Sequence, residues 1–370
     1  MRDDASVSPL VHCSKRLISD GRERTRIVKI LPFRDCIMRL LTIVLSACFW
    51  LLPHSVAAQD PALLHACERN DAAACFDIGW MYDTGRGAPV DKPQAALAYQ
   101  RACDLGDARG CVDLGMLHTD GDGIPQDDTA AFLLFYRSCE LDYGLGCRNL
   151  GNSYRDGVGV ALDLAAAEAM FRKSCDLEFG DGCTSLGSVF ERGTGVALDI
   201  TEAMRLYQLA CDLSSALGCG NLGYLQFHTR PDYDAALVNL GTACARGLSY
   251  SCFELGNMHF EGRGLPRDFT AATRLYLGSC NDGYFFACVR LGLNYSSGRG
   301  IAQNDDLAAA LFRQACAIGA PFGCYHLAYN YENGLGVNVD VAQAVAQYRM
   351  ACAGNLQDAC DQLARLGEQP

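Results

Sequence analysis

Residues 139–147 read Cys-Glu-Leu-Asp-Tyr-Gly-Leu-Gly-Cys, and this stretch decides the fold because its cysteine spacing recurs along the chain. After residue 58 every cysteine belongs to a pair separated by eight positions. Successive pairs begin 36 residues apart, except for one step of 33. A fixed period of this length is typical of solenoids of stacked helical hairpins. The pairs are Cys67/Cys75, Cys103/Cys111, Cys139/Cys147, Cys175/Cys183, Cys211/Cys219, Cys244/Cys252, Cys280/Cys288, Cys316/Cys324 and Cys352/Cys360.

The spacing of eight indicates that the chain turns between the two cysteines of each pair. In one unbroken helix they would lie about 12 Å apart, whereas a disulfide needs Cα atoms within about 4.4 to 6.8 Å. Glycines such as Gly106, Gly144 and Gly180 supply the turn. We therefore expect each disulfide to join the second helix of one hairpin to the first helix of the next. Zinc binding and reduced core cysteines are the alternatives; the even cysteine count, an N-terminal export signal and the lack of any Cys-x-x-Cys favour disulfides.

Other positions repeat in step with the cysteines. Four residues after the second cysteine of a pair comes a small residue, from Gly79 to Ala328, which predicts a close approach by another helix. A Gly-x-Gly then ends the first helix, and an Asp or Asn such as Asp163 begins the second. A bulky residue four positions before the next cysteine, such as Phe171, packs on the same stripe of the second helix.

The composition narrows the class of protein. Of 370 residues, 31 are Lys or Arg and 43 are Asp or Glu, which gives a net charge of −12 and argues against nucleic acid as a partner. Half of the residues are hydrophobic, so the chain can bury a core without a cofactor or metal, and we expect neither. We expect a monomer.

The N-terminal segment has the layout of an export signal. Arg39 precedes an apolar stretch from Leu40 to Leu52, and the small residues 56–58 form a cleavage site. The apolar stretch is shorter than the roughly 20 residues of a membrane-spanning helix, so we expect no transmembrane span in the mature protein. The sequence predicts a signal region over residues 1–58, a start at Met38, and a periplasmic or secreted solenoid over residues 59–370. Lipidation at Cys48, within Leu-Ser-Ala-Cys, is the alternative.

The repeats resemble a known family. Gly182-Cys183-Thr184-Ser185-Leu186-Gly187, followed by Gly-x-Gly, Asp and Ala-Cys, is similar to the Sel1-like repeat, a relative of the tetratricopeptide repeat. The paired cysteines resemble the Helicobacter cysteine-rich protein family, and the match covers roughly residues 60–366. The resemblance implies an exported bacterial solenoid of right-handed superhelical αα-hairpins with one disulfide per repeat. It also implies penicillin binding and weak β-lactamase activity.

Catalytic motifs do not support that enzymatic expectation. The chain has no Ser-x-x-Lys, no Gly-x-Ser-x-Gly and no His-x-His, and neither Lys92 nor Lys173 stands in Lys-Thr-Gly. Catalytic residues therefore stay unassigned, and activity against β-lactams rests on the resemblance alone.

The best candidates for ligand contact are the positions that vary between copies on the first helix of each hairpin. A solenoid binds partners along one extended surface, and packing does not fix these positions. Two residues after the second cysteine come Asp77, Asp113, Asn149, Glu254, Arg290 and His326. A solvated polar face without a ligand explains this column equally well. Five residues after it come Trp80, Tyr224 and Tyr329, for which core packing is the simpler interpretation and ligand contact the alternative.

The sequence thus predicts an all-α solenoid of about eight hairpins with terminal helices near 61–69 and 358–366. We expect a module that binds a protein, a peptide or a peptidoglycan-derived ligand. Penicillin binding with weak β-lactam hydrolysis is the alternative function.

Overall fold

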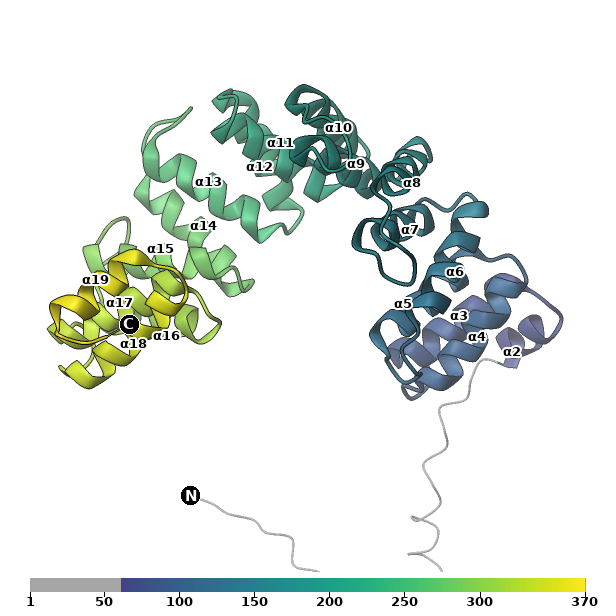
Figure 1. Cartoon of the computed structure of the whole chain (residues 1–370), viewed down its shortest axis with the longest axis horizontal. Coiled ribbons are helices and arrows are strands. Elements are labelled where there is room, and N and C mark those ends of the chain that lie inside the picture. The colour runs from purple at the N-terminus through teal and green to yellow at the C-terminus, as the bar shows by residue number, and fades with distance from the viewer. Residues whose placement is uncertain (1–60, 370) are drawn as a thin grey trace, which may run out of the picture. The chain divides into compact units, whose positions relative to one another are not determined.

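The computed structural model describes residues 61–369, and its regular elements in that range are α-helices (Figure 1). The predictions for the export signal and Cys48 lie outside these residues. No helix between residues 61 and 369 is both long and apolar enough to cross a membrane. The helices are α2 (Pro61–Glu68), α3 (Ala72–Thr84), α4 (Lys92–Asp104), α5 (Ala108–Asp120), α6 (Asp128–Glu140), α7 (Gly144–Asp156), α8 (Leu164–Asp176), α9 (Gly180–Arg192), α10 (Ile200–Asp212), α11 (Ala216–His228), α12 (Tyr233–Ala245), α13 (Ser249–Glu261), α14 (Phe269–Asn281), α15 (Phe285–Ser297), α16 (Asp305–Ala317), α17 (Pro321–Asn333), α18 (Val341–Ala353) and α19 (Gln357–Arg365).

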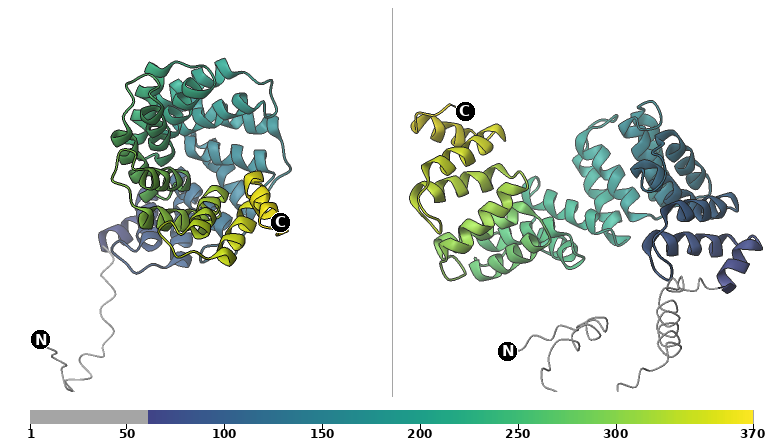
Figure 2. Two further views of the ribbon diagram at one scale, coloured as in Figure 1. Left: turned by 90° about the vertical axis from the view of Figure 1, so that its left-hand side faces the viewer. Right: turned by 90° about the horizontal axis from the view of Figure 1, so that it is seen from below.

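The helices pair in chain order into eight hairpins, from α3/α4 to α17/α18, with α2 and α19 at the two ends (Figures 1 and 2). Each hairpin packs on the next through its second helix and the following first helix. First helices of neighbouring hairpins also touch, as α5 and α7 do. The predicted all-α repeat solenoid, including both terminal helices, is confirmed.

Side-chain and glycine caps set the ends of these helices. The Asp163 carboxylate accepts hydrogen bonds from the backbone N–H groups of Ala165 (3.0 Å) and Ala166 (2.9 Å), which satisfies donors at the start of α8. Gly157 ends α7 with φ of 68°, and Gly159 follows with φ of 71°, so both adopt the left-handed conformation that glycine tolerates. An Asp or Asn cap begins each second helix from α4 to α18.

The repeated glycine of the first helix makes room for a ring of the second. A Cβ atom placed on Gly187 would lie 2.7 Å from Cε1 of Tyr207, and one on Gly115 would lie 2.6 Å from Cε1 of Phe135. Tyr207 is fully buried, so it has nowhere to move. The close approach predicted from the sequence is confirmed, and it accounts for a residue that helix propensity disfavours.

Nine disulfides cross from one hairpin, or terminal helix, to the next, with Cα–Cα distances between 4.4 and 4.9 Å. One disulfide per repeat, with the predicted pairing, is therefore present. The bonds are Cys67–Cys75, Cys103–Cys111, Cys139–Cys147, Cys175–Cys183, Cys211–Cys219, Cys244–Cys252, Cys280–Cys288, Cys316–Cys324 and Cys352–Cys360.

The second cysteine of each pair lies in a first helix, or in α19 at the end of the stack, and faces the core. Cys252 and Cys360 are half-buried. The other seven are between 0 and 2% exposed, and they are Cys75, Cys111, Cys147, Cys183, Cys219, Cys288 and Cys324. These sulfur atoms are therefore part of the packing between hairpins rather than of the surface.

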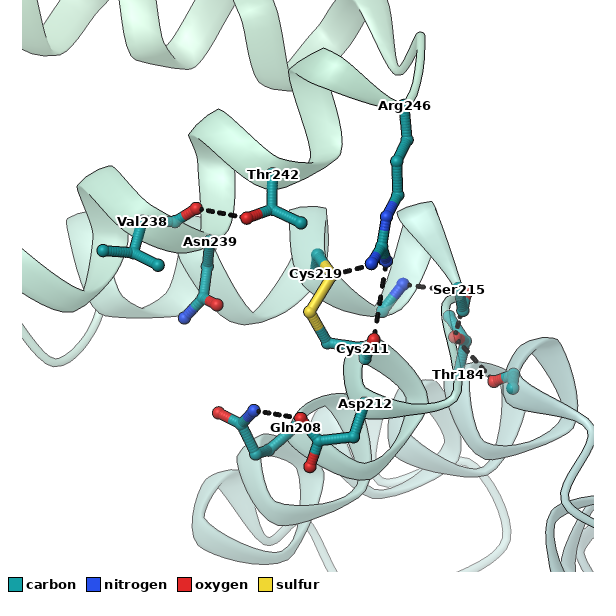
Figure 3. Close-up of a disulfide and its surroundings, with 12 residues drawn as sticks. Thr184, Gln208, Cys211, Asp212, Ser215, Cys219, Val238, Asn239, Thr242 and Arg246 are labelled. Carbon is teal, nitrogen blue, oxygen red and sulfur yellow. Dashed lines mark hydrogen bonds between the residues drawn. A yellow bond between two sulfur atoms is a disulfide. The ribbon is translucent and has the colours of Figure 1, made fainter.

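An arginine contact reinforces one of these junctions. Figure 3 shows Cys211–Cys219, where the Arg246 guanidinium donates to the Cys211 carbonyl (3.4 Å) and to Sγ of Cys219 (3.3 Å). Arg246 follows α12 of the hairpin that contains Cys219, so its contact with the Cys211 carbonyl spans the same junction as the disulfide.

The step of 33 residues shortens one hairpin connection. Four residues, 229–232, link α11 to α12, whereas seven residues, 85–91, link α3 to α4. The deletion therefore removes the Gly-x-Gly turn and leaves both helices at 13 residues.

Candidate functional site

The surface of interest runs along the first helices and is formed by four repeat positions. These positions lie two residues before, and two, five and nine residues after, the second cysteine of each pair. Their separations of four, three and four residues place them on one face of a helix. We call this face the first-helix stripe. In α5, for example, it consists of Arg109, Asp113, Met116 and Asp120.

The acidic pocket is the first of three consecutive hollows lined by the stripe between α3 and α11. It has a volume of about 330 Å³ and lies where α3, α4 and α5 meet. Nζ of Lys92 lies 2.7 Å from a carboxylate oxygen of Asp83 and 2.7 Å from one of Asp122. Burial, followed by the charge of Asp83, raises the pKa of Asp113 to about 6. The lining residues are Trp80, Asp83, Thr84, Lys92, Asp113, Met116, Leu117, Asp120 and Asp122, so four carboxylates face one ammonium group.

The apolar pocket follows between α5, α6 and α7. It has a volume of about 410 Å³, and side chains such as Phe135 and Leu145 form its apolar wall. Asn149 and Asn152 contribute amide groups that can both donate and accept hydrogen bonds. The complete lining is Met116, Thr119, Asp120, Asp128, Ala131, Phe135, Leu145, Arg148, Asn149, Asn152, Ser153, Asp156 and Val158.

The arginine pocket comes third, with a volume of about 200 Å³. Arg148, which also lines the apolar pocket, carries a buried Nε–H that has no hydrogen-bond partner among residues 61–369. Arg155 is paired with Asp156, and Arg192 forms no ion pair within the described part of the chain. The pocket also contains Phe171, Asp181, Thr184, Ser185, Ser188, Val189, Thr194, Leu217 and Asn221, so its polar lining is mostly hydroxyl and guanidinium groups.

The stripe becomes aromatic from α11 onward. Phe286, Phe322 and Tyr329 are 39%, 47% and 45% exposed, respectively. Glu254, by contrast, is only 6% exposed, and its Oε2 lies 3.1 Å from Nε2 of His228. Charge thus dominates the first half of the stripe, and rings dominate the second half.

The predicted contact residues occupy different environments on this stripe. Trp80 and Asp113 share the acidic pocket, and Asn149 lies in the apolar pocket. Trp80 is 38% exposed, so the core-packing interpretation is wrong for Trp80 and equally for Tyr329. The remaining candidates do not line these pockets: Asp77 and Arg290 are exposed, Tyr224 and His326 are half-buried, and Glu254 is buried.

His326 is embedded against a core ring rather than presented to a ligand. Its imidazole stacks on Phe312 with ring centroids 5.1 Å apart. Burial, followed by the positive charge of Arg290, lowers the pKa of His326 to about 4. The side chain is therefore neutral at pH 7.

Sequence reasoning missed the other half of the stripe. The positions two before and nine after the cysteine supply Leu145, Asp120 and Arg192 to the pockets. These positions lie four or seven residues from the two predicted ones, which are two and five residues after the cysteine. That helical spacing was the signal that could have found them. Arg148 and Arg155, one and eight residues after the cysteine, lie beside the stripe and have no such signal.

The described residues contain neither a metal-binding cluster nor an unpaired lysine. Within residues 61–369 no three His, Cys, Asp or Glu side chains are grouped so that they could hold a metal ion. Lys173 lies 3.0 Å from a carboxylate oxygen of Asp142 and donates to the Cys139 carbonyl at 2.8 Å. With Lys92 also paired, both lysines in this range make structural contacts.

The architecture defines the class of this molecule as a disulfide-bonded helical repeat protein with a pocketed first-helix surface. The family model for the Sel1 repeat matches residues 72–107, 108–143, 144–179, 180–215, 249–284, 286–319 and 321–356. The chain therefore belongs to the Sel1 repeat family, whose repeats are protein-interaction modules. The unmatched residues 216–248 include the short hairpin α11/α12.

Solved structures share this fold. A protective antigen of uropathogenic Escherichia coli that displays an SLR fold is 25% identical, with a TM-score of 0.64, over 84% of this chain and 67% of that chain. A Sel1 repeat protein from Oxalobacter formigenes is 22% identical, with a TM-score of 0.59, over 84% and 90%. Helicobacter pylori cysteine-rich protein B is 34% identical over 37% of this chain and 99% of that chain, with a TM-score of 0.31. No curated protein matches the sequence. The nine disulfides fit an exported protein.

Proposed function

We propose that this protein binds an extended peptide along the first-helix stripe, outside the cytosol. The observation that carries the proposal is that three consecutive pockets are lined by the same repeat positions on successive first helices. We propose that the chain is cleaved near residue 58 and is periplasmic or secreted. Lipid anchoring at Cys48 is the alternative.

The order of the pockets suggests the chemistry of the peptide. The four carboxylates of the acidic pocket suit a basic side chain, and Phe135 and Leu145 suit an apolar one. The unpartnered Nε–H of Arg148 suits a carboxylate, because a buried donor without an acceptor is costly. A free peptide carboxyl end is one source of that group, and a peptidoglycan-derived peptide is another. Hydrolysis of β-lactams is not part of the proposal, since no observation on the described residues favours it.

The length of the ligand follows from the spacing of helices. Packed helices lie about 8 to 10 Å apart, and an extended peptide advances about 3.3 Å per residue. About three peptide residues therefore separate the groups that enter neighbouring pockets. A suitable probe is acetyl-Arg-Ala-Ala-Leu-Ala-Ala-Glu with a free C-terminus, which places a base, an apolar side chain and carboxylates at that interval.

Tryptophan fluorescence provides a direct test. Trp80 lies in the acidic pocket and is the single tryptophan after residue 58. We expect the probe to change its emission in a saturable way, and we expect Arg148→Gln combined with Arg192→Gln to weaken binding at least tenfold. Arg313→Gln, an exposed arginine on the second helix α16, removes a charge away from the stripe and serves as the control.

Two results would contradict the proposal. One is equal affinity of the wild-type protein for the probe and for a peptide of the same composition in scrambled order. The other is an unchanged affinity in the Arg148→Gln/Arg192→Gln variant, provided that its circular dichroism and melting temperature match those of the wild type.

A further inference from the structure

A buried carboxylate on α13 has one oxygen without a partner. Glu254 is 6% exposed, and both of its close polar contacts involve Oε2: Nδ2 of Asn257 donates at 3.1 Å, and Nε2 of His228 lies at 3.1 Å. Oε1 accepts no hydrogen bond from residues 61–369. Oε1 is not one of the fully buried atoms, so a donor from outside the chain can reach it and form a hydrogen bond.

Three tyrosine rings contact one another in a row, and the middle one, Tyr250, lies one helical turn before Glu254 on α13. Tyr224 of α11, Tyr250 of α13 and Tyr284 before α15 are half-buried, and their ring centroids follow one another at 5.9 and 6.1 Å. Burial, followed by the charge of Glu254, raises the pKa of Tyr250 and that of Tyr284, the latter to about 12. The field of the carboxylate therefore reaches both rings.

No arginine or lysine of the described chain neutralises Glu254. Arg290 occupies the same repeat position on α15, but its guanidinium lies 6.0 Å from the ring centroid of Phe260, and it forms no ion pair in residues 61–369. Arg263 pairs with Glu261 instead. His228, whose side chain is 36% exposed, is the one basic group in contact with Glu254.

We propose that Glu254, Tyr224, Tyr250 and Tyr284 form a binding site for a lysine ammonium group. The faces of aromatic rings attract a cation, and a carboxylate beside them accepts its N–H bonds. A compact ammonium can use the single free oxygen, whereas the bidentate contact that an arginine fork favours uses both oxygens of a carboxylate, and Oε2 is already engaged. We take the lysine to be a side chain of the peptide ligand in the proposed function, so the source of the ammonium group rests on that proposal.

Capped tripeptides test the site without requiring the rest of the groove. The probe is acetyl-Gly-Lys-Gly-amide, whose single charge is the lysine side chain, titrated into the full oxidised protein with ¹³C-labelled tyrosine rings. We expect saturable NMR shifts of Tyr224, Tyr250 and Tyr284 with a Kd of about 1 to 10 mM, as suits one small contact site. Acetyl-Gly-norleucine-Gly-amide and acetyl-Gly-Arg-Gly-amide are expected to bind at least tenfold more weakly.

The matched variants are Glu254→Gln and Glu140→Gln. Glu254→Gln keeps the shape of the side chain and removes its charge, and we expect it to weaken binding of the lysine probe at least tenfold. Glu140→Gln makes the same chemical change at an exposed position of the second helix α6, away from the first-helix stripe, and is expected to leave the tyrosine shifts unchanged.

Equal shifts with the norleucine peptide on wild-type protein would overturn this inference, whether or not the variants fold. Binding to Glu254→Gln within twofold of wild type would overturn it as well. Neither result bears on the Trp80 titration, which tests the peptide groove at the other end of the stripe. A failure of that titration would overturn the peptide groove and leave the tripeptide result standing.

Discussion

At the scale of single residues, the contact between a glycine of the first helix and a bulky side chain of the second helix constrains the sequence. Gly187 contacts Tyr207, and the equivalent glycines contact Tyr99, Phe135, Phe171, Leu240, Tyr276 or Phe312. Helix propensity alone would favour alanine at these positions by about 1 kcal/mol. The packing cost of one added methyl group exceeds that gain, so glycine is retained.

Gly187→Ala should therefore lower the free energy of unfolding by about 1 to 2 kcal/mol, because strain against the buried ring outweighs the gain in helix propensity. Gly278→Ala on α14 is the matched control, since a Cβ there meets nothing within 4 Å. The control is expected to raise stability by about 0.5 to 1 kcal/mol. Urea unfolding followed by circular dichroism measures both, and a Gly187→Ala variant as stable as the control would refute the packing argument.

Asp113 should make stability depend on pH. Its pKa is raised to about 6 in the folded state, so the folded protein holds this proton more tightly than the unfolded chain. Its contribution therefore becomes less favourable as pH rises from about 4 to 6. Asp113→Asn removes this loss. When pH rises from 4 to 7.5, the free energy of unfolding of Asp113→Asn should therefore increase by about 1 to 2 kcal/mol relative to that of the wild type, a figure reduced for solvent screening. Unfolding midpoints at both values measure it, with Asp77→Asn as the exposed control; equal pH profiles for wild type and Asp113→Asn would contradict the assignment.

At the scale of elements, each disulfide closes a short loop between two packed helices. Cys175 of α8 and Cys183 of α9 have Cα atoms 4.4 Å apart, and both are buried. The closed loop of about nine residues corresponds to about 2.6 kcal/mol in the chain-entropy model. Because helices contact mainly their neighbours, the effect of one disulfide should stay near its own junction.

Replacing Cys175 and Cys183 together by alanine should increase the rate of amide hydrogen exchange in α8 and α9 by roughly one to two orders of magnitude. The disulfide contributes about 2.6 kcal/mol, and the packing that remains between the two helices keeps the effect at or below that value. Exchange in α15 to α18 should stay unchanged. Mass spectrometry of peptides from native-state exchange measures both regions. A uniform increase along the chain would show that the solenoid opens as one unit, contrary to this prediction.

Most elements could be predicted from the sequence because each is set by local chemistry that repeats. Cysteine spacing gave the hairpin junctions, Asp163 and its equivalents gave the starts of second helices, and Gly157 gave the end of a first helix. The binding surface was harder to predict. Exposure of Trp80 and burial of Glu254 depend on which neighbours fill the space around each helix, and the repeat pattern does not encode this. The hydrogen-bonding state of Arg148 likewise depends on contacts between three helices.

At the scale of the whole molecule, charge is distributed unevenly along the stack. Residues 61–215 contain 24 acidic and 12 basic residues, whereas residues 216–369 contain 13 and 10. All three pockets lie between residues 80 and 221, in or beside the acidic half. The first five hairpins therefore contain the three pockets proposed to hold the heptapeptide probe.

A fragment of residues 59–246 carrying Cys244→Ala should consequently fold and bind the heptapeptide probe within about threefold of the full-length affinity, since distant repeats do not contribute contacts. The substitution removes the one cysteine whose partner, Cys252, is lost. Trp80 fluorescence measures binding, and circular dichroism measures helicity. A helical fragment that fails to bind would show that later hairpins take part in the groove.

Because each of the nine disulfides between residues 61 and 369 joins cysteines eight positions apart, correct pairing in this part of the chain never depends on finding a distant thiol. Disulfides can form one after another while the chain is still being exported. Each new disulfide leaves the later cysteines with their own nearest partner. The same locality allows the molecule to change length over generations. A duplicated or lost period of 36 residues carries a complete set of sulfur atoms with it, so no remaining pair has to exchange its partner.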